Sequence, residues 1–218
     1  MATTPTTPTT AAELWTIIKK EITGIQLLWE IVNGLYFQPQ GNGWQSLQAD
    51  APTLTNVMQT ALMESLLIRV SRMMDPAATR ELKNLSLKQL VGANKNIDAD
   101  EKVIRAIWDG SGLVKIRNKY LSHNDLDTSL KENHTLNIPL EKADIVALQQ
   151  LVEGLRTLRR DVNLKLNGVT YVDQGLDLMV QRDIQMLGRT LLGGELFFTL
   201  LPEHELLQQA LESEEQKK

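Results

Sequence analysis

The chain has 218 residues, of which 42% are hydrophobic and 23% charged, and its 23 Lys and Arg against 27 Asp and Glu give a formal net charge of −4. This length fits one domain with appendages and can bury a core, while the acidity excludes a protein that coats nucleic acid through net charge alone. The absence of cysteine excludes a disulfide scaffold, a thiolate metal site and a cysteine nucleophile. Neither a membrane-spanning stretch nor a signal peptide is found, so we expect a soluble cytoplasmic protein.

Threonine and proline dominate residues 1–10, which have nothing to bury and are predicted to be a disordered tail. Thr10 and Glu13 have the spacing of a capping box, so a helix should begin there and continue to about residue 37. Its apolar residues recur every three or four positions and predict one buried stripe. The members of this stripe are Leu14, Ile18, Ile22, Ile25, Trp29, Val32 and Tyr36.

A second helix is predicted over about residues 52–75, with Asp50 as its cap and Pro52 in its first turn. The Asp75-Pro76 step ends it, because the helical conformation is disfavoured for a residue that precedes proline. The residues expected on its buried side are Leu54, Val57, Ala61, Leu62, Ser65, Ile68 and Met73.

Two helical segments are predicted in the middle of the chain. A short helical turn is expected over 86–92, and Asp98 with Glu101 has capping-box spacing for a longer helix. The glycines at 110–112 interrupt that helix, and the helical pattern resumes over about 113–122.

Residues 124–139 are predicted to form a polar loop, followed by helices over about 140–166 and 174–191. Short connections between long amphipathic helices favour antiparallel neighbours. The predicted fold class is therefore all-α, an antiparallel up-and-down helical bundle with extra C-terminal helices. We assign residues 11–166 to the bundle, 167–211 to a C-terminal helical extension and 212–218 to a charged tail.

Common catalytic and metal-binding patterns are missing from the sequence. It has no glycine-rich phosphate loop, and the His204-Glu205 pair has no second histidine at the spacing of a zinc protease. The other histidines, His123 and His134, lie in separate segments. No metal site and no cofactor are therefore predicted.

The candidate site lies in segment 115–125, where the charge of the chain is locally inverted. Between residues 102 and 123, five basic residues stand against Asp109 as the only acidic one. A basic island on an acidic protein favours a local anionic ligand over non-specific coating of a polymer. The five basic residues are Lys102, Arg105, Lys115, Arg117 and Lys119.

Compact polar groups suited to a phosphodiester follow one another in this segment: Arg117, Asn118, Ser122 and His123. Arginine offers a bidentate fork to phosphate oxygens, and histidine can transfer protons near neutral pH. On spacing alone, the favoured interpretation is still structural. It treats Arg117 as a surface ion-pair residue and His123 as a donor that caps the end of its helix.

Taken together, Arg117-Asn118-Lys-Tyr-Leu-Ser-His123 resembles the Arg-x(4–6)-His signature of the HEPN superfamily (higher eukaryotes and prokaryotes nucleotide-binding), in its form Arg-Asn-x-x-x-x-His. The segments Arg72-Met-Met-Asp-Pro76 and Asn84-Leu-Ser-Leu87 precede it, and their order resembles the abortive-infection branch of that superfamily. The resemblance extends over about residues 14–166.

This resemblance implies a helical bundle that forms a homodimer and acts as a metal-independent endoribonuclease, in phage defence or as a toxin. Arg117 would stabilise the charge of the phosphorane, Asn118 would position the phosphate, and His123 would act as general acid or base. The paired motifs would meet across the dimer, and the RNA would be cleaved through its own 2′-OH. Partners would include RNA and a cognate antitoxin or nucleotidyltransferase. The alternative is a non-catalytic helical module that binds a nucleotide or a protein partner, because many members have lost catalysis.

Four more basic residues are candidates for binding the substrate. Lys115 and Lys119 flank the motif, and Arg69 and Arg72 of the second helix could extend the surface that binds phosphate. Arg69, Arg72 and Asp75 are spaced by three, so they also fit a network of ion pairs within one helix. That structural interpretation is the favoured one for the two arginines.

Overall fold

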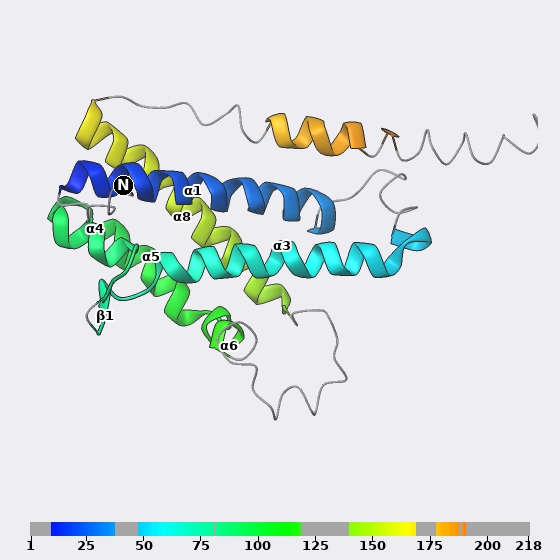
Figure 1. Cartoon of the computed structure of the whole chain (residues 1–218), viewed down its shortest axis with the longest axis horizontal. Coiled ribbons are helices and arrows are strands. Elements are labelled where there is room, and N and C mark those ends of the chain that lie inside the picture. Colours follow the sequence, from blue (N-terminus) through cyan, green and yellow to red (C-terminus); the bar gives the residue numbers. More distant parts are fainter. Residues whose placement is uncertain are drawn as a thin grey trace, which may run out of the picture.

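A computed structural model describes residues 10–37, 48–80, 82–118, 140–168, 178–187 and 189–190. Most of them are helical, which confirms the all-α fold class (Figure 1). The long helices are α1 (Ala11–Val32), α3 (Pro52–Met73), α5 (Asp98–Gly110) and α8 (Lys142–Asn167). Shorter elements are the π-helical turn η1 (Asn33–Phe37), α4 (Leu87–Ala93), the 3-10 turn η2 (Lys95–Ile97) and α6 (Leu113–Ile116). Within this part of the chain, the strands are β1 (Ala78–Thr79) and β2 (Leu82–Lys83), which pair antiparallel.

Several predicted segments lie outside the described residues: the tail before Thr10, the loop over 124–139 and the chain after residue 190. The domain boundaries therefore remain predictions. The helix predicted over 174–191 is described in part, since 178–187 and 189–190 are helical.

Helix α1 is the centre of the bundle, packing against α3, α4 and α8. In Figure 1, α1 and α3 lie side by side with opposite chain directions. The predicted capping box is confirmed, because Thr10 Oγ1 accepts the Glu13 N–H at 3.2 Å and Glu13 Oε2 accepts the Thr10 N–H at 3.1 Å. The predicted stripe of α1 is buried as far as Val32, while Tyr36 in η1 is half-buried.

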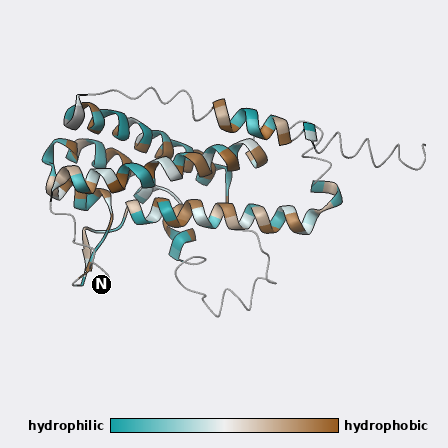
Figure 2. Ribbon diagram, turned by 45° about the horizontal axis from the view of Figure 1, so that its top comes forward, coloured by the Kyte–Doolittle hydropathy of each residue, from teal (hydrophilic) through white to brown (hydrophobic). Residues whose placement is uncertain are grey.

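Polar bonds between helices fix how α8 sits on α1. The Trp15 indole donates to Asn163 Oδ1 at 2.9 Å, and Arg159 Nη1 donates to Thr23 Oγ1 at 2.7 Å. Helix α8 also packs against α5, so it joins α1 to the helices that carry the candidate site. The apolar faces of these helices point inward and their polar faces outward (Figure 2).

The predicted buried side of α3 is wrong in the first half of the helix, although Leu62 is partly buried against the core as expected. Leu54 and Val57 are 54% and 45% exposed, and the residues that enter the core are instead Met63, Leu66, Leu67 and Val70, with Met73 as predicted. The physical reason is that the stretch from Pro52 to Met63 contains no charged residue, so apolar spacing fits either side of the helix. Ala51, without a side-chain bond, is the N-cap of α3, so the predicted cap by Asp50 is also wrong.

Candidate functional site

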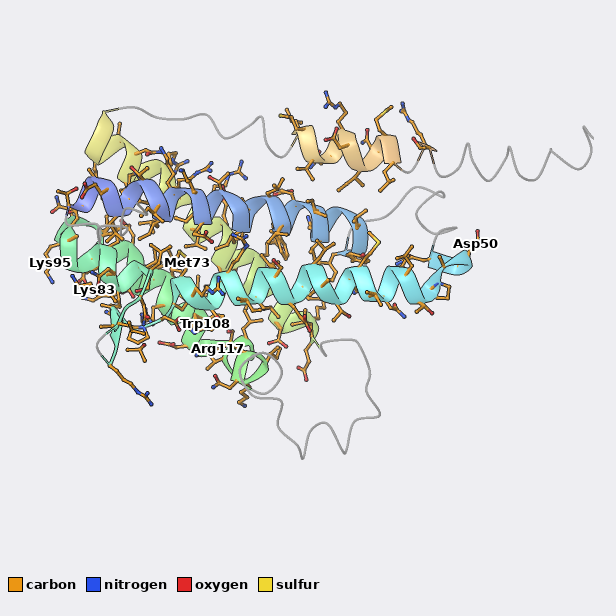
Figure 3. The ribbon with its side chains drawn as sticks, in the orientation of Figure 1. Asp50, Met73, Lys83, Lys95, Trp108 and Arg117 are labelled. Carbon is orange, nitrogen blue, oxygen red and sulfur yellow. The ribbon has the colours of Figure 1, made fainter. Side chains whose placement is uncertain are left out.

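Arg117 follows the last residue of α6, a four-residue helix whose Leu113 and Ile116 are buried in the core. The tight turn before α6 is held by Ser111, whose hydroxyl donates to Trp108 O at 2.7 Å and accepts the Leu113 N–H at 3.3 Å. This turn and the two buried side chains place Arg117 beside α5 and the C-terminal end of α3. Figure 3 shows Arg117 and Trp108 on this side of the bundle, below the end of α3 where Met73 is labelled.

Glycine is required at position 112 of this turn. A Cβ atom on Gly112 would collide with the carboxylate of Asp144, which is buried at the start of α8 and accepts the Glu141 N–H at 3.1 Å. The close approach of α8 to this turn therefore sets where α6 begins.

The side chain of Arg117 forms an ion pair with Asp75, the second residue after α3. Arg117 Nη2 lies 3.0 Å from Asp75 Oδ1, and the two side chains are 35% and 25% exposed. The ion-pair interpretation of Arg117 is thus correct, and its partner lies in the chain just after α3. A guanidinium has five N–H donors, so this contact leaves others that can bind an anion.

The favoured intrahelical network of Arg69, Arg72 and Asp75 is wrong. Arg69 Nη1 pairs with Glu21 Oε2 of α1 at 2.9 Å, and Asp75 pairs with Arg117. Helix α3 ends at Met73, so Asp75 is not on the helical surface that carries the two arginines. The side chain of Arg72 is exposed, and its guanidinium has no hydrogen bond or ion pair to any described residue.

The remaining candidates divide into described and undescribed residues. Lys115 and Asn118 are exposed and flank Arg117 on the same short segment. Lys119 and His123 lie outside the described residues, so whether His123 meets Arg117 stays a prediction.

A second polar layer lies behind the Arg117–Asp75 pair. Glu101 of α5 is only 1% exposed, and its carboxylate binds Arg105 Nε at 2.6 Å and Lys88 Nζ at 3.5 Å. Sequence analysis assigned Glu101 to a capping box, but Ile97 is the N-cap of α5 and has no side-chain bond. The available signal was the spacing of four between Glu101 and Arg105, which suits an ion pair on one helix.

Comparison with known protein families matches this chain to the HEPN family AbiU2, over residues 18–177. The match covers well over half of the chain and includes the site just described. The chain belongs to the AbiU2 family of HEPN proteins. No curated protein and no solved structure matches it significantly.

Within the described part of this HEPN domain, no group of three or more histidine or acidic side chains is arranged to hold a metal ion. None of the described helices is both long enough and apolar enough to cross a membrane. Among its described residues, the candidate site presents arginine, lysine, asparagine and carboxylate side chains.

Proposed function

We propose that this protein is a metal-independent endoribonuclease of the HEPN type that acts in phage defence or as a toxin. The observation that carries the proposal is Arg117, a partly exposed guanidinium paired with Asp75 in a chain of the AbiU2 family. Arg117 is the first residue of the segment that resembles the HEPN signature. Exposed Lys115 and Asn118 lie close to Arg117 in the sequence, and exposed Arg72 lies three positions before its partner Asp75, on a chain whose net charge is −4.

The proposed reaction is a transesterification within the RNA. The 2′-oxygen attacks the adjacent phosphorus, the bond to the 5′-oxygen breaks, and the products are a 2′,3′-cyclic phosphate and a 5′-hydroxyl. Arg117 stabilises the charge that develops on the phosphoryl oxygens, and Asn118 positions the phosphate. His123 takes the proton of the 2′-OH or supplies one to the departing oxygen.

A homodimer is part of this proposal, because two copies about a twofold axis bring two Arg117 residues to one basic cleft. Such a cleft requires the segment 113–123 to lie near the axis, and the exposed apolar side of α3 that contains Leu54, Val57 and Met58 can extend the contact to the second copy. This side carries no charged residue between Pro52 and Met63, so two identical copies can approach without like-charge repulsion.

The experiment is incubation of the purified chain with single-stranded RNA in excess chelator, beside the His123→Ala variant. We expect the wild type to cleave and to leave cyclic phosphate ends, while DNA and 2′-O-methyl RNA stay intact. His123→Ala should lose about 10²–10⁴-fold in rate, as expected for a general acid or base. A magnesium requirement or cleavage of DNA would contradict the mechanism, and no cleavage at all would favour the non-catalytic binding module.

A further inference from the structure

Arg105 of α5 makes two strong bonds at once. Its Nε binds the buried Glu101 carboxylate at 2.6 Å, and its Nη1 donates to the backbone oxygen of Met74 at 2.9 Å. Its Nη2 is buried and has no partner among the described residues, so these two bonds fix the head group. A buried carboxylate is costly unless it is paired, which ties Arg105 firmly to Glu101.

The bond to Met74 acts where α3 ends. Met74 is the C-cap residue of α3, and it is followed by Asp75 and Pro76. The last carbonyl groups of a helix have no partner within the helix, so an arginine that binds one of them stabilises the end. Arg105 therefore stabilises the backbone at the point where it leaves α3.

The same bond orients Asp75. The carbonyl oxygen of Met74 belongs to the peptide unit that contains the nitrogen and Cα of Asp75, and a peptide unit is planar. A hydrogen bond that holds this oxygen restricts the Cα of Asp75 as well. The Asp75 carboxylate then holds Arg117 at 3.0 Å.

We propose that Arg105 is a positioning residue of the candidate site, which orients Arg117 through Met74 and Asp75. The expected effect of Arg105 on RNA cleavage rests on the proposed ribonuclease function. Its expected effect on the Asp75–Arg117 pair does not depend on that function.

The Arg105→Lys variant distinguishes the positioning of Arg117 from simple neutralisation of the Glu101 charge. Arg105→Lys keeps a cation beside Glu101, but one ammonium lacks the planar fork that reaches both Glu101 and Met74. If Arg105 only neutralises Glu101, the lysine should replace it.

The decisive experiment is a double-mutant cycle of Asp75→Ala and Arg117→Ala, measured by urea unfolding in the wild-type and Arg105→Lys backgrounds. In the wild-type background we expect a favourable coupling free energy between Asp75 and Arg117. In the Arg105→Lys background this coupling should be lost. The side-chain Nε–Hε signal of Arg117 in NMR spectra should shift in Arg105→Lys towards its position in Asp75→Ala.

The matched control is Lys102→Ala on the same helix. Lys102 forms an ion pair of the same spacing and length, 2.6 Å to Asp98, on the exposed side of α5. Its hydrogen bond and charge lower the pKa of the Asp98 carboxyl. Lys102→Ala should leave the Asp75–Arg117 coupling and the Arg117 signal unchanged.

If Arg105→Lys fails to fold, the neutral pair Glu101→Gln with Arg105→Gln replaces it, because this pair leaves no buried charge. An unchanged coupling and an unchanged Arg117 signal in the folded variant would overturn the proposal.

In cleavage assays, Arg105→Lys should lower kcat by about 10–100-fold with little change in KM, as for a displaced catalytic group. If wild-type protein does not cleave RNA, the proposed function fails, and the coupling still decides the role of Arg105.

Discussion

Arg117 and Asp75 are 42 positions apart in the sequence, and their ion pair joins the end of α6 to the chain just after α3. Both side chains are partly exposed, so the pair contributes little to folding, about 0.2–1 kcal/mol. The ion pair instead orients Arg117, because one bonded nitrogen restricts the plane of the guanidinium. The other N–H donors of Arg117 stay available.

Removing Asp75 should separate binding from catalysis. Asp75→Ala deletes a negative charge beside Arg117, so RNA should bind more tightly and KM should fall. Because the guanidinium is no longer oriented, kcat should fall by about tenfold or more. Steady-state kinetics on a short RNA measures both constants. A kcat equal to that of the wild type would show that Asp75 does not position Arg117.

Arginine should be needed at position 117 for its shape as well as its charge. Arg117→Lys should lower kcat by about 10²–10³-fold, nearly as much as Arg117→Ala, because the planar fork is lost in both. Lys20→Ala, an exposed change on α1, is the control and should leave kcat unaffected. Wild-type rates in Arg117→Lys would mean that a point charge is sufficient.

Two leucines of α3 should differ sharply in their effect on stability. Leu66 is fully buried, so Leu66→Ala should lower the free energy of unfolding by about 2–5 kcal/mol. Leu54→Ala should change it by no more than about 0.5 kcal/mol in dilute protein, since Leu54 is exposed. Urea unfolding of both variants measures this difference, and equal losses would contradict the orientation of α3 described above.

Trp29 should act as a core residue rather than as a platform that stacks RNA bases. It is buried in α1, and the centroid of its ring lies 6.2 Å from that of Phe37. Trp29→Ala should cost about 3–5 kcal/mol in thermal or urea unfolding. Ile17→Ala, on the exposed side of the same helix, is the control and should be nearly neutral. A Trp29→Ala variant with an unchanged melting temperature would contradict this packing.

The uncharged side of α3 should control association. Val57→Glu places a charge on that side and should convert the proposed dimer to a monomer in light scattering, with the helical content unchanged. Leu27→Glu makes the same change at a similarly exposed apolar position of α1 and should leave the dimer intact. A wild type that is monomeric at tens of micromolar protein, well above the Kd of a stable dimer, would remove the composite cleft.

The difference between α1 and α3 shows what apolar periodicity can predict. In α1, charged residues such as Lys20 and Glu21 separate the apolar positions, so only one side of the helix can be buried. In α3, the first half has no charge to mark the outer side, and the pattern fits two orientations. Tertiary packing against α1 decides between them, and this information is not local in the sequence.

The same limit applies to the candidate site. The position of Arg117 could be predicted because its motif is continuous in the sequence. Its partner Asp75 and the bond from Arg105 to Met74 O could not, since they join residues 42 and 31 positions apart. The spacing of Glu101 and Arg105 fits the ion pair that they form, but the sequence predicted a capping box for Glu101 instead. The predicted pairing of Arg69 and Arg72 with Asp75 is wrong, because α3 ends before Asp75.

The central place of α1 has a consequence for biosynthesis. Trp15 and Thr23 of α1 bond to Asn163 and Arg159 of α8, which lie 148 and 136 positions further along the chain. Helix α1 therefore leaves the ribosome long before α8 has been translated. Until then, Ile18 and its apolar neighbours on α1 can be covered only in part, by α3 and α4. The nascent chain therefore exposes a strongly apolar helix for most of its synthesis, a state prone to aggregation and open to chaperones. Any activity that depends on the completed bundle is delayed until α8 has emerged.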